Sequence, residues 1–199
     1  MKSVLLYLHG FNSSPGSAKA QQMAAWVAAW VAANRPDIEV IIPAQPNTPA
    51  AAWAAIEQTI ADLQRRYGSE FKLGAVGSSL GGFMATRVSE QYGCRAALIN
   101  PAVRPHELLC DYLGPQTNPY TGEQYELLPQ HMDELRALAV PVTAPERLWI
   151  LQQQGDEVLD YRKALDEYRF ARLSLECGGN HAFVAFERYP AQIIRFLGL

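Results

Sequence analysis

Short continuous apolar segments alternate along the chain with longer segments whose apolar positions recur every three or four residues. The first kind is typical of strands buried on both faces of a sheet, and the second is typical of helices with one buried face. The apolar segments predict strands at residues 4–8, 39–42, 72–77, 96–99, 148–151 and 173–176. The periodic segments predict helices at residues 17–34, 49–67, 81–92, 161–168 and 190–197. This order predicts an α/β fold with a mostly parallel, six-stranded sheet and helices on both of its faces.

The first predicted helix gathers its large apolar side chains on one face. Met23, Trp26, Val27, Trp30 and Val31 follow the spacing of such a face. The two tryptophans would also suit a platform for a ligand. Their spacing favours packing in the hydrophobic core, which is the ordinary place for aromatic side chains.

One long segment, residues 101–147, interrupts the alternation of strands and helices. It contains seven prolines and two short helical patterns, at residues 106–113 and 129–138. The segment is too short and too broken to carry a core of its own. We therefore expect one domain, residues 1–199, with this insertion as a small cap over the carboxyl edge of the sheet. A long crossover connection is the alternative that the pattern leaves open.

Composition narrows the classes of function. The 199 residues are 49% hydrophobic and carry a net charge of −3 without a basic stripe, which argues against a nucleic-acid-binding protein. No apolar stretch reaches the length of a membrane span, and residues 4–8 are too short for the core of a signal peptide. Cys94, Cys110 and Cys177 are widely spaced and odd in number. They suit a reducing cytoplasm better than a disulfide framework or a zinc site.

A candidate nucleophile lies between the third predicted strand and the helix after it. Residues 77–81 read Gly-Ser-Ser-Leu-Gly, which is the G-x-S-x-G pattern of a nucleophile elbow. In this sharp turn the central serine is exposed above the sheet, and its neighbours two residues away need to lack a Cβ atom. The pattern alone is weak evidence, but the flanking strand and helix supply its expected context. We therefore predict Ser79 as the nucleophile.

A serine hydroxyl needs a base to take its proton and an acid to orient that base. In this class of elbow the order along the chain is Ser, then Asp or Glu, then His. His181 lies in a glycine-rich turn after the last predicted strand, and Asp156 is the first carboxylate after the fifth. Glu157 and Asp160 are the alternatives. We expect Glu157 to point the opposite way and Asp160 to begin the next helix, so we favour Asp156.

The turn after the first predicted strand is the expected place for donors to an oxyanion. It reads His9-Gly10-Phe11, and Gly10 allows the backbone to approach closely. We predict the backbone N–H groups of Phe11 and Leu80 as the two donors. His9 is expected to hold the shape of this turn, since no second metal ligand lies at a suitable spacing from it.

The residues predicted to wall an acyl pocket are Phe11, Ser13, Asn100 and Phe183, together with parts of the insertion. They are mostly apolar with a few polar groups, which suits a small-molecule substrate with an acyl chain. This chemistry needs neither a metal ion nor an organic cofactor. The sequence gives no signal for the oligomeric state.

Five motifs, taken together and in this order, resemble the YqiA-like esterases of bacteria: residues 8–15 (LHGFNSSP), 77–82 (GSSLGG), 100–101 (NP), 155–158 (GDEV) and 179–181 (GNH). The resemblance covers essentially the whole chain. It implies a compact α/β-hydrolase that lacks the first antiparallel strands of larger hydrolases. It also implies hydrolysis of a carboxylic ester or thioester by Ser79, Asp156 and His181. A lipase, peptidase or lactonase on the same fold remains open, as does a binding protein with little turnover.

Overall fold

The computed structural model describes residues 2–34, 37–68 and 70–199. In this part of the chain six strands form one sheet in the order β2-β1-β3-β4-β7-β8, and each neighbouring pair is parallel. The strands are β1 (Lys2–Leu8), β2 (Ile38–Ile41), β3 (Phe71–Ser78), β4 (Arg95–Ile99), β7 (Leu148–Gln153) and β8 (Arg172–Glu176). The six strands predicted from the apolar segments and their parallel arrangement are confirmed.

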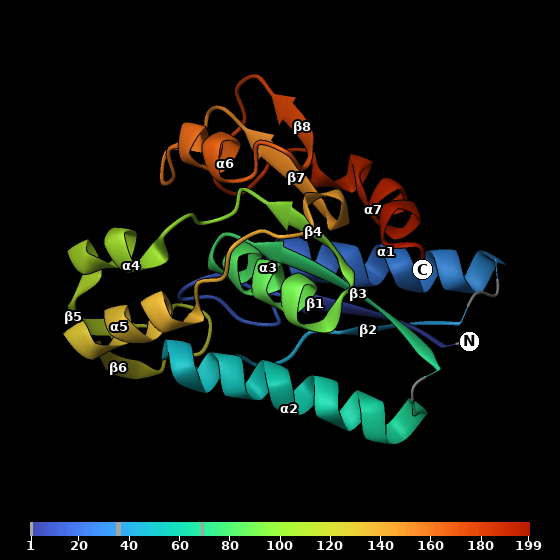
Figure 1. Ribbon diagram of the computed structural model, residues 1–199, viewed down its shortest axis with the longest axis horizontal. Helices are drawn as coiled ribbons and strands as arrows, with labels where there is room; N and C mark the ends of the chain where they lie inside the picture. The colour runs from blue at the N-terminus through green and yellow to red at the C-terminus, as the bar shows by residue number, and fades with distance from the viewer. Residues whose placement is uncertain (1, 35–36, 69) are drawn as a thin grey trace.

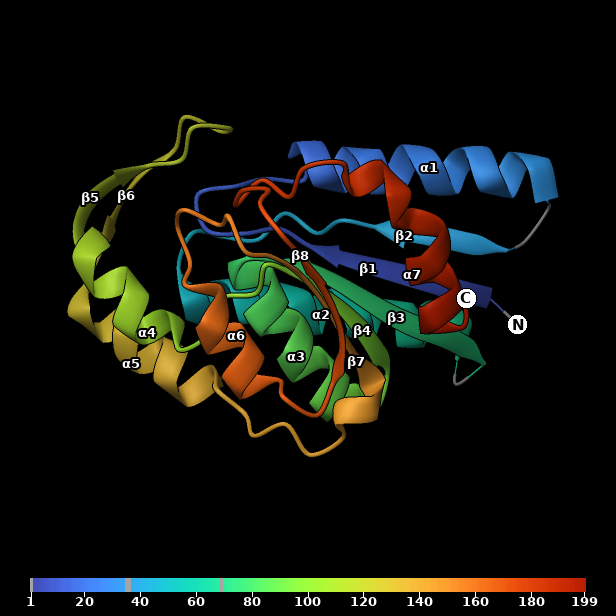
Figure 2. The ribbon, with the colours of Figure 1, turned by 90° about the horizontal axis from the view of Figure 1, so that it is seen from above.

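Helices cover both faces of this sheet, as the alternation of patterns predicted. They are α1 (Ala18–Asn34), α2 (Pro49–Tyr67), α3 (Leu80–Tyr92), α6 (Tyr161–Glu167) and α7 (Pro190–Leu197). Helices α1 and α7 lie on one face, and α2, α3 and α6 lie on the other (Figures 1 and 2). Each connecting helix returns the chain to the amino end of the next strand, and right-handed crossovers that run in opposite directions across the sheet place their helices on opposite faces.

Neighbouring side chains of the strands enter two separate cores. Leu5 and Tyr7 of β1 join the core under α1 and α7, whereas Leu6 and Leu8 join the core under α2 and α3. All four are fully buried. Both faces of the strand are covered, so the segment is continuously apolar rather than alternating.

The predicted face of α1 is only partly correct. Met23 and Val27 are buried, but Trp26 and Trp30 are half-exposed. The two rings stack on each other at 5.9 Å between centroids and pack against the rim of the core. Their bulk explains the difference, because two indoles four residues apart can shield each other without entering the core.

The insertion between β4 and β7 is more ordered than its sequence suggested. Its elements are α4 (Pro105–Leu108), the 3₁₀ helix η1 (Leu109–Tyr112), β5 (Gly114–Thr117), β6 (Gln124–Leu127), α5 (Pro129–Leu138) and the 3₁₀ helix η2 (Pro145–Arg147). Strands β5 and β6 form an antiparallel hairpin that we did not predict. Their residues are short, mostly polar runs without a clear alternation of apolar side chains. Figures 1 and 2 show α4, α5 and the hairpin beyond the carboxyl ends of the sheet strands.

Polar contacts hold this insertion in place. The backbone N–H of Ala50, in the first turn of α2, donates to Glu134 Oε2 of α5 at 3.0 Å. A carboxylate at this position also interacts favourably with the positive end of the helix dipole. The side-chain amide of Asn118 in the hairpin loop donates to the carbonyl oxygen of Ser13 at 3.0 Å. The insertion is thus anchored both to α2 and to the turn after β1.

Strand β1 lies between β2 and β3, so the chain leaves β1 toward one edge of the sheet and leaves β3 toward the other. The connections that leave β1 and β3 therefore diverge to opposite faces, and a crevice opens at their carboxyl ends. The turn after β1 and the turn after β3 meet at this crevice. They carry the predicted oxyanion donors and the predicted nucleophile, respectively.

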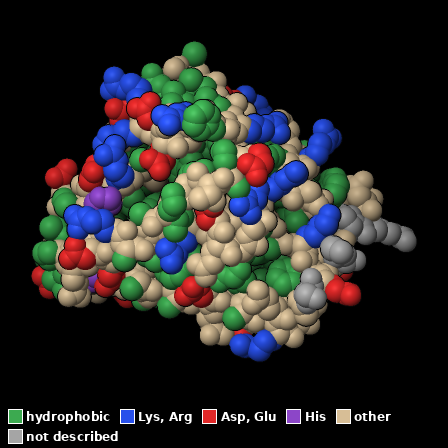
Figure 3. Space-filling model, in the orientation of Figure 1, with side chains coloured by type: hydrophobic (Ala, Val, Ile, Leu, Met, Phe, Trp, Pro, Cys, Tyr) green, Lys and Arg blue, Asp and Glu red, His purple; other side chains and the backbone are tan. Residues whose placement is uncertain are grey.

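The surface in Figure 3 carries Lys, Arg, Asp and Glu side chains interspersed, without a continuous basic stripe on this face. Of the helices in the described part of the chain, none has both the length and the hydrophobicity needed to cross a bilayer.

Candidate active site

Ser79 lies at the apex of the turn between β3 and α3. Its φ of 57° and ψ of −121° lie in a region that non-glycine residues rarely adopt, at a cost of about 1–3 kcal/mol. Backbone contacts maintain this conformation: the N–H of Ser79 donates to the carbonyl oxygen of Ile99 at 3.0 Å. The carbonyl oxygen of Ser79 accepts from the N–H groups of Gly82 at 2.8 Å and Ala102 at 3.0 Å. The strained turn is therefore held from β4 and from α3.

The glycines of the turn are required by close backbone packing. A Cβ atom on Gly77 would lie 2.0 Å from the carbonyl oxygen of Gly81. A Cβ atom on Gly10, in the turn after β1, would lie 3.3 Å from the Cβ atom of Ser79. The absence of a side chain at Gly77 lets the elbow close on itself, and its absence at Gly10 leaves room for the turn after β1 beside the apex.

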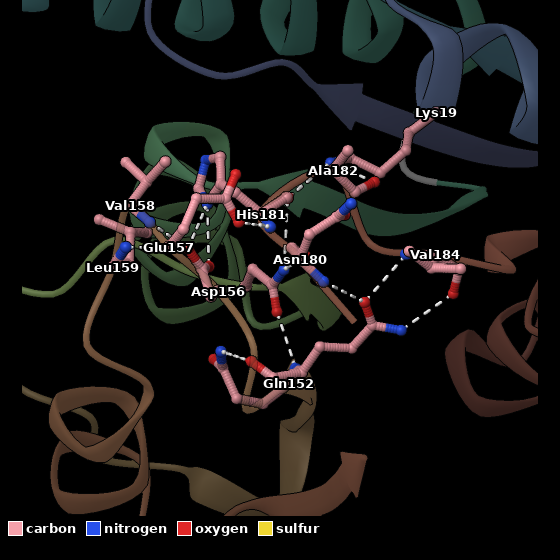
Figure 4. Close-up of polar contacts among 12 residues, drawn as sticks. Lys19, Gln152, Asp156, Glu157, Val158, Leu159, Asn180, His181, Ala182 and Val184 are labelled. Carbon is pink, nitrogen blue, oxygen red and sulfur yellow. Dashed lines mark hydrogen bonds and ion pairs between the residues drawn. The ribbon is translucent and has the colours of Figure 1, made fainter. Parts of the chain in front are cut away.

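His181 and Asp156 meet at the carboxyl edge of β7 and β8 (Figure 4). The Nδ1 atom of His181 lies 2.8 Å from Oδ2 and 3.0 Å from Oδ1 of Asp156. The Asp156 side chain is fully buried, and its Oδ1 also accepts from the N–H groups of Val158 at 2.9 Å and Leu159 at 2.8 Å. Because the carboxylate is an acceptor, Nδ1 carries the hydrogen and Nε2 is the basic nitrogen.

Two other carboxylates of this region have separate roles. The N–H of His181 donates to Glu157 Oε2 at 3.0 Å, and this contact lowers the pKa of Glu157. The expectation that Glu157 points away was wrong, because a short turn brings the histidine backbone over it. Asp160 accepts from the N–H of Arg162 at 3.1 Å and caps α6, so its predicted place at the start of a helix is confirmed.

Ser79 and His181 line two cavities at this edge of the sheet. The cap cavity, of about 340 Å³, is mostly walled by apolar side chains of the insertion and of the segment after β7, which include Leu108, Leu109, Tyr112, Val158 and Leu159. The helix cavity, of about 350 Å³, lies toward the start of α1, and its wall includes the hydroxyl and ammonium side chains of Ser13, Ser17 and Lys19 beside apolar surface. In the described part of the chain the Ser79 hydroxyl makes no hydrogen bond to His181. Such contacts are often long before a substrate binds.

The two predicted oxyanion donors lie beside Ser79. Phe11 and Leu80 both line the cap cavity. Leu80 is the first residue of α3, so its N–H has no acceptor within the helix and lies at the positive end of the helix dipole. An anion is favoured at this place on both grounds.

His9 stabilises the turn that carries Phe11. Its side chain is buried, and its Nε2 accepts from the N–H of Gln45 at 3.4 Å. Its Nδ1 lies 3.2 Å from the carbonyl oxygen of Gly10. Burial lowers the pKa of His9, so the ring is neutral and links the turn after β1 to the segment after β2.

The predicted walls of the acyl pocket divide into two groups. Phe11 lines both cavities and Ser13 lines the helix cavity. Asn100 is fully buried, and Phe183 is 3% exposed and packs against Phe186 and Tyr189. A substrate-binding role does not fit Asn100 and Phe183 here, because packing and hydrogen bonds keep their side chains below the cavities.

The model of the Uncharacterised protein family UPF0227 matches residues 4–198. The chain belongs to this YqiA-like family. The resemblance that the five sequence motifs carried is therefore confirmed.

Solved structures share the fold of this YqiA-like protein at low sequence identity. A candidate hydrolase from Agrobacterium vitis S4 aligns with a TM-score of 0.74 and 20% identity, covering 98% of this chain and 88% of that one. Est1E from Butyrivibrio proteoclasticus aligns with a TM-score of 0.73 and 12% sequence identity, covering 98% of this chain and 86% of that one. XC6422 from Xanthomonas campestris, an α/β serine hydrolase without a lid, aligns with a TM-score of 0.64 and 12% sequence identity. The alignment covers 97% of this chain and 81% of that one. The fold is the α/β-hydrolase fold.

A buried amide network holds the turn that carries His181 (Figure 4), and sequence reasoning missed it. The Asn100 side chain donates to the carbonyl oxygens of Asn180 at 3.0 Å and His181 at 3.3 Å, and it accepts from the N–H of Gln153 at 3.0 Å. The Oε1 atom of Gln153 accepts from the N–H groups of Asn180 at 3.1 Å and Val184 at 2.9 Å. The available signal was the run of glutamines that ends the otherwise apolar β7.

Replacement of Gln153 by leucine is expected to destabilise the YqiA-like protein by about 1–3 kcal/mol. The change leaves the partly buried N–H groups of Asn180 and Val184 without their acceptor, which costs part of the free energy that a fully buried unpaired group would cost. Urea unfolding measures the loss of free energy, and hydrogen exchange should accelerate at the same two amides. Gln154→Leu is the matched control, since the Gln154 side chain is half-exposed. Equal effects of the two substitutions would contradict the role of the network.

Proposed function

We propose that this protein is a serine hydrolase that cleaves carboxylic ester or acyl thioester bonds through Ser79, His181 and Asp156. The proposal is supported by the Asp156–His181 pair, whose basic Nε2 belongs to a side chain that lines the same two cavities as Ser79. It is further supported by the strain at Ser79, since strained backbone concentrates at functional sites. The fold and family agree with hydrolase chemistry.

The proposed reaction has two halves. In the first, Ser79 Oγ attacks the acyl carbon while His181 Nε2 takes its proton, and the N–H groups of Phe11 and Leu80 bind the oxyanion. His181 then gives this proton to the leaving oxygen or sulfur, and the acyl group remains on Ser79. In the second half His181 deprotonates a water molecule that attacks the acyl-enzyme, and Ser79 leaves with the returned proton. Asp156 orients the imidazole and stabilises its charged form.

The two cavities suit a substrate with two dissimilar ends. The apolar cap cavity is the better place for a hydrocarbon group, and the helix cavity can receive a more polar one. The substrate is a small molecule in this proposal, and the reaction uses no metal ion or organic cofactor. The cytoplasmic location stays a prediction.

Labelling with a fluorophosphonate tests the proposal before any substrate is known. The probe should phosphonylate Ser79 in the native protein, with fluoride as the leaving group, and peptide mass spectrometry should place the adduct there. Heat-denatured protein should not react, because the unfolded chain lacks the base and the oxyanion donors. Absence of label on the native protein, or label on a different residue, would contradict the assignment and favour a binding protein with little turnover.

A panel of acyl esters and acyl-CoA thioesters of graded chain length then separates the substrate classes. Hydrolysis of these substrates with a dependence on acyl length supports the esterase or thioesterase assignment. Turnover of peptides or lactones in place of acyl esters would move the protein to another hydrolase class on the same fold.

A further inference from the structure

The helix cavity contains a lysine whose position the proposed reaction does not explain. Lys19, in the first turn of α1, lines this cavity together with Ser79 and His181. Its Nζ atom donates to the carbonyl oxygens of Ala182 at 3.1 Å and His181 at 3.4 Å (Figure 4). Lys19 therefore places a positive charge beneath the histidine turn, at the same edge of the sheet as the nucleophile.

The ammonium group of Lys19 retains binding capacity. It carries three N–H donors, and the two carbonyl oxygens take only two of them. In the described part of the chain no carboxylate forms an ion pair with it. Burial lowers the pKa of Lys19 to about 8, and the charge of Asp156 opposes part of this shift. No carboxylate of the described chain contacts the ammonium directly, so an anion that enters the cavity can form a charge-assisted hydrogen bond with it.

Hydroxyl groups on the wall of this cavity can add hydrogen bonds to such an anion. The side chains of Ser13 and Ser17 line the cavity, and each carries one O–H donor. Tyr7, on β1, also lines the cavity, but its hydroxyl oxygen is inaccessible to solvent and therefore lies out of reach of a ligand.

The charges around the cavity disfavour a ligand with more than one negative charge. Lys19 supplies one positive charge, while Glu157 lines the same cavity and is ionised, with its pKa lowered by the N–H of His181. A dianion such as a phosphate would leave one charge without compensation beside Glu157. A carboxylate needs one counter-charge and accepts hydrogen bonds from hydroxyl groups.

We propose that the helix cavity binds a carboxylate of the substrate, with the Lys19 ammonium as its counter-charge and the hydroxyl groups of Ser13 and Ser17 as further donors. This inference rests on the proposed hydrolase function and names the class of substrate: an ester or thioester that carries one carboxylate away from the scissile bond. The apolar part of the substrate occupies the cap cavity.

Two substrate pairs of matched size test the carboxylate on either side of the scissile bond. On the acyl side, the 4-nitrophenyl ester of adipate is compared with that of adipamate. On the alcohol side, 4-acetoxybenzoate is compared with 4-acetoxybenzamide. The carboxylate should raise kcat/KM about 10-fold or more in one of the pairs, as a charge-assisted hydrogen bond in a partly buried site does.

Substitution of Lys19 should remove this preference. Lys19→Met should bring the ratio of kcat/KM between acid and amide close to one, and Lys19→Arg should retain most of it. Lys72→Met is the matched control, since Lys72 also donates to a backbone carbonyl, at 3.2 Å to Gly198, but at the opposite edge of the sheet. The ratio is the informative quantity, because a purely structural role of Lys19 would change both members of a pair equally.

The ratio should also fall as the pH rises through about 8, since Lys19 is charged below its pKa and neutral above it. His181 and Asp156 act on the scissile bond of both esters of a pair, so their contribution cancels in the ratio. Tyr7 and His9 stay neutral there, since burial raises the pKa of Tyr7 and lowers that of His9. Tyr120 also lines the cavity, but it is the same in every variant and therefore contributes equally to each comparison.

Three results would overturn the carboxylate site. Ratios near one for both pairs in the wild-type protein would remove the site and leave the hydrolase proposal intact. An equal loss on acid and amide in Lys19→Met, with an unchanged ratio, would make Lys19 a positioning residue of the histidine turn only. Failure to hydrolyse any of the four esters, together with no fluorophosphonate label on Ser79, would remove the hydrolase proposal and the site with it.

Discussion

Replacement of Ser79 by alanine is expected to lower kcat/KM for ester hydrolysis by about 10⁴-fold or more. The substitution removes the atom that is proposed to form the acyl-enzyme and leaves the proposed oxyanion donors and the cavities in place. Initial rates with a 4-nitrophenyl ester, at substrate concentrations well below KM, measure the loss directly.

The fold should survive this change. Alanine and serine share a Cβ atom, so the strain at φ 57° is the same for both, and the free energy of unfolding should stay within about 0.5 kcal/mol of the wild type. Ser3→Ala is the matched control, because Ser3 belongs to β1 at the opposite edge of the sheet. Hydrolysis by the Ser79 variant within about 10-fold of the wild-type rate, with the preparation shown to be free of other esterases, would exclude Ser79 as the nucleophile.

Replacement of Gly81 by alanine should have the largest effect on stability. A Cβ atom there would lie 2.0 Å from the carbonyl oxygen of Leu8 and 2.7 Å from that of His9. Both are backbone atoms, in the last residue of β1 and in the residue after it, so no side-chain rotation relieves the overlap. We expect a loss of at least about 3 kcal/mol and a fall in Tm of about 10 °C, measured by urea unfolding and calorimetry.

Gly16→Ala is the control for Gly81. The corresponding Cβ atom would meet only the hydroxyl of Ser14 at 3.3 Å, at an exposed position before α1. Its stability should change by less than about 1 kcal/mol. A stable, fully active Gly81→Ala protein would show that the elbow can relax away from β1, against the packing described above.

The sequence predicted those parts of the molecule in which local pattern and global structure agree. The continuous apolar runs gave the strands because both faces of a parallel sheet are covered, and the elbow pattern located Ser79 because its steric demands are local. The position of His181 beside Asp156 was accessible for a related reason, since the carboxyl ends of parallel strands meet at one edge of the sheet.

What the sequence did not reveal depends on contacts between distant segments. Asn100 resembled a pocket residue because it follows a strand beside the elbow. Its side-chain amide instead donates hydrogen bonds to the backbone of the turn that carries His181. The hairpin of residues 114–127 is held by polar partners on the turn after β1, which no periodicity of its own residues could show. Glu157 accepts a hydrogen bond from the backbone N–H of His181, which is distant in the sequence, so the residues around Glu157 did not reveal its orientation.

The contacts between the hairpin and the turn after β1 have a practical consequence for protein engineering. Besides the hydrogen bond from Asn118 to Ser13, the hydroxyl of Tyr125 donates to Asn12 Oδ1 at 2.7 Å. The insertion and the turn after β1 therefore form one unit. A chimaera that exchanges only residues 101–147 with a relative would break this unit. Residues 11–14 would have to be exchanged together with the insertion, so that a chimaera designed for a different substrate keeps the geometry of the turn after β1.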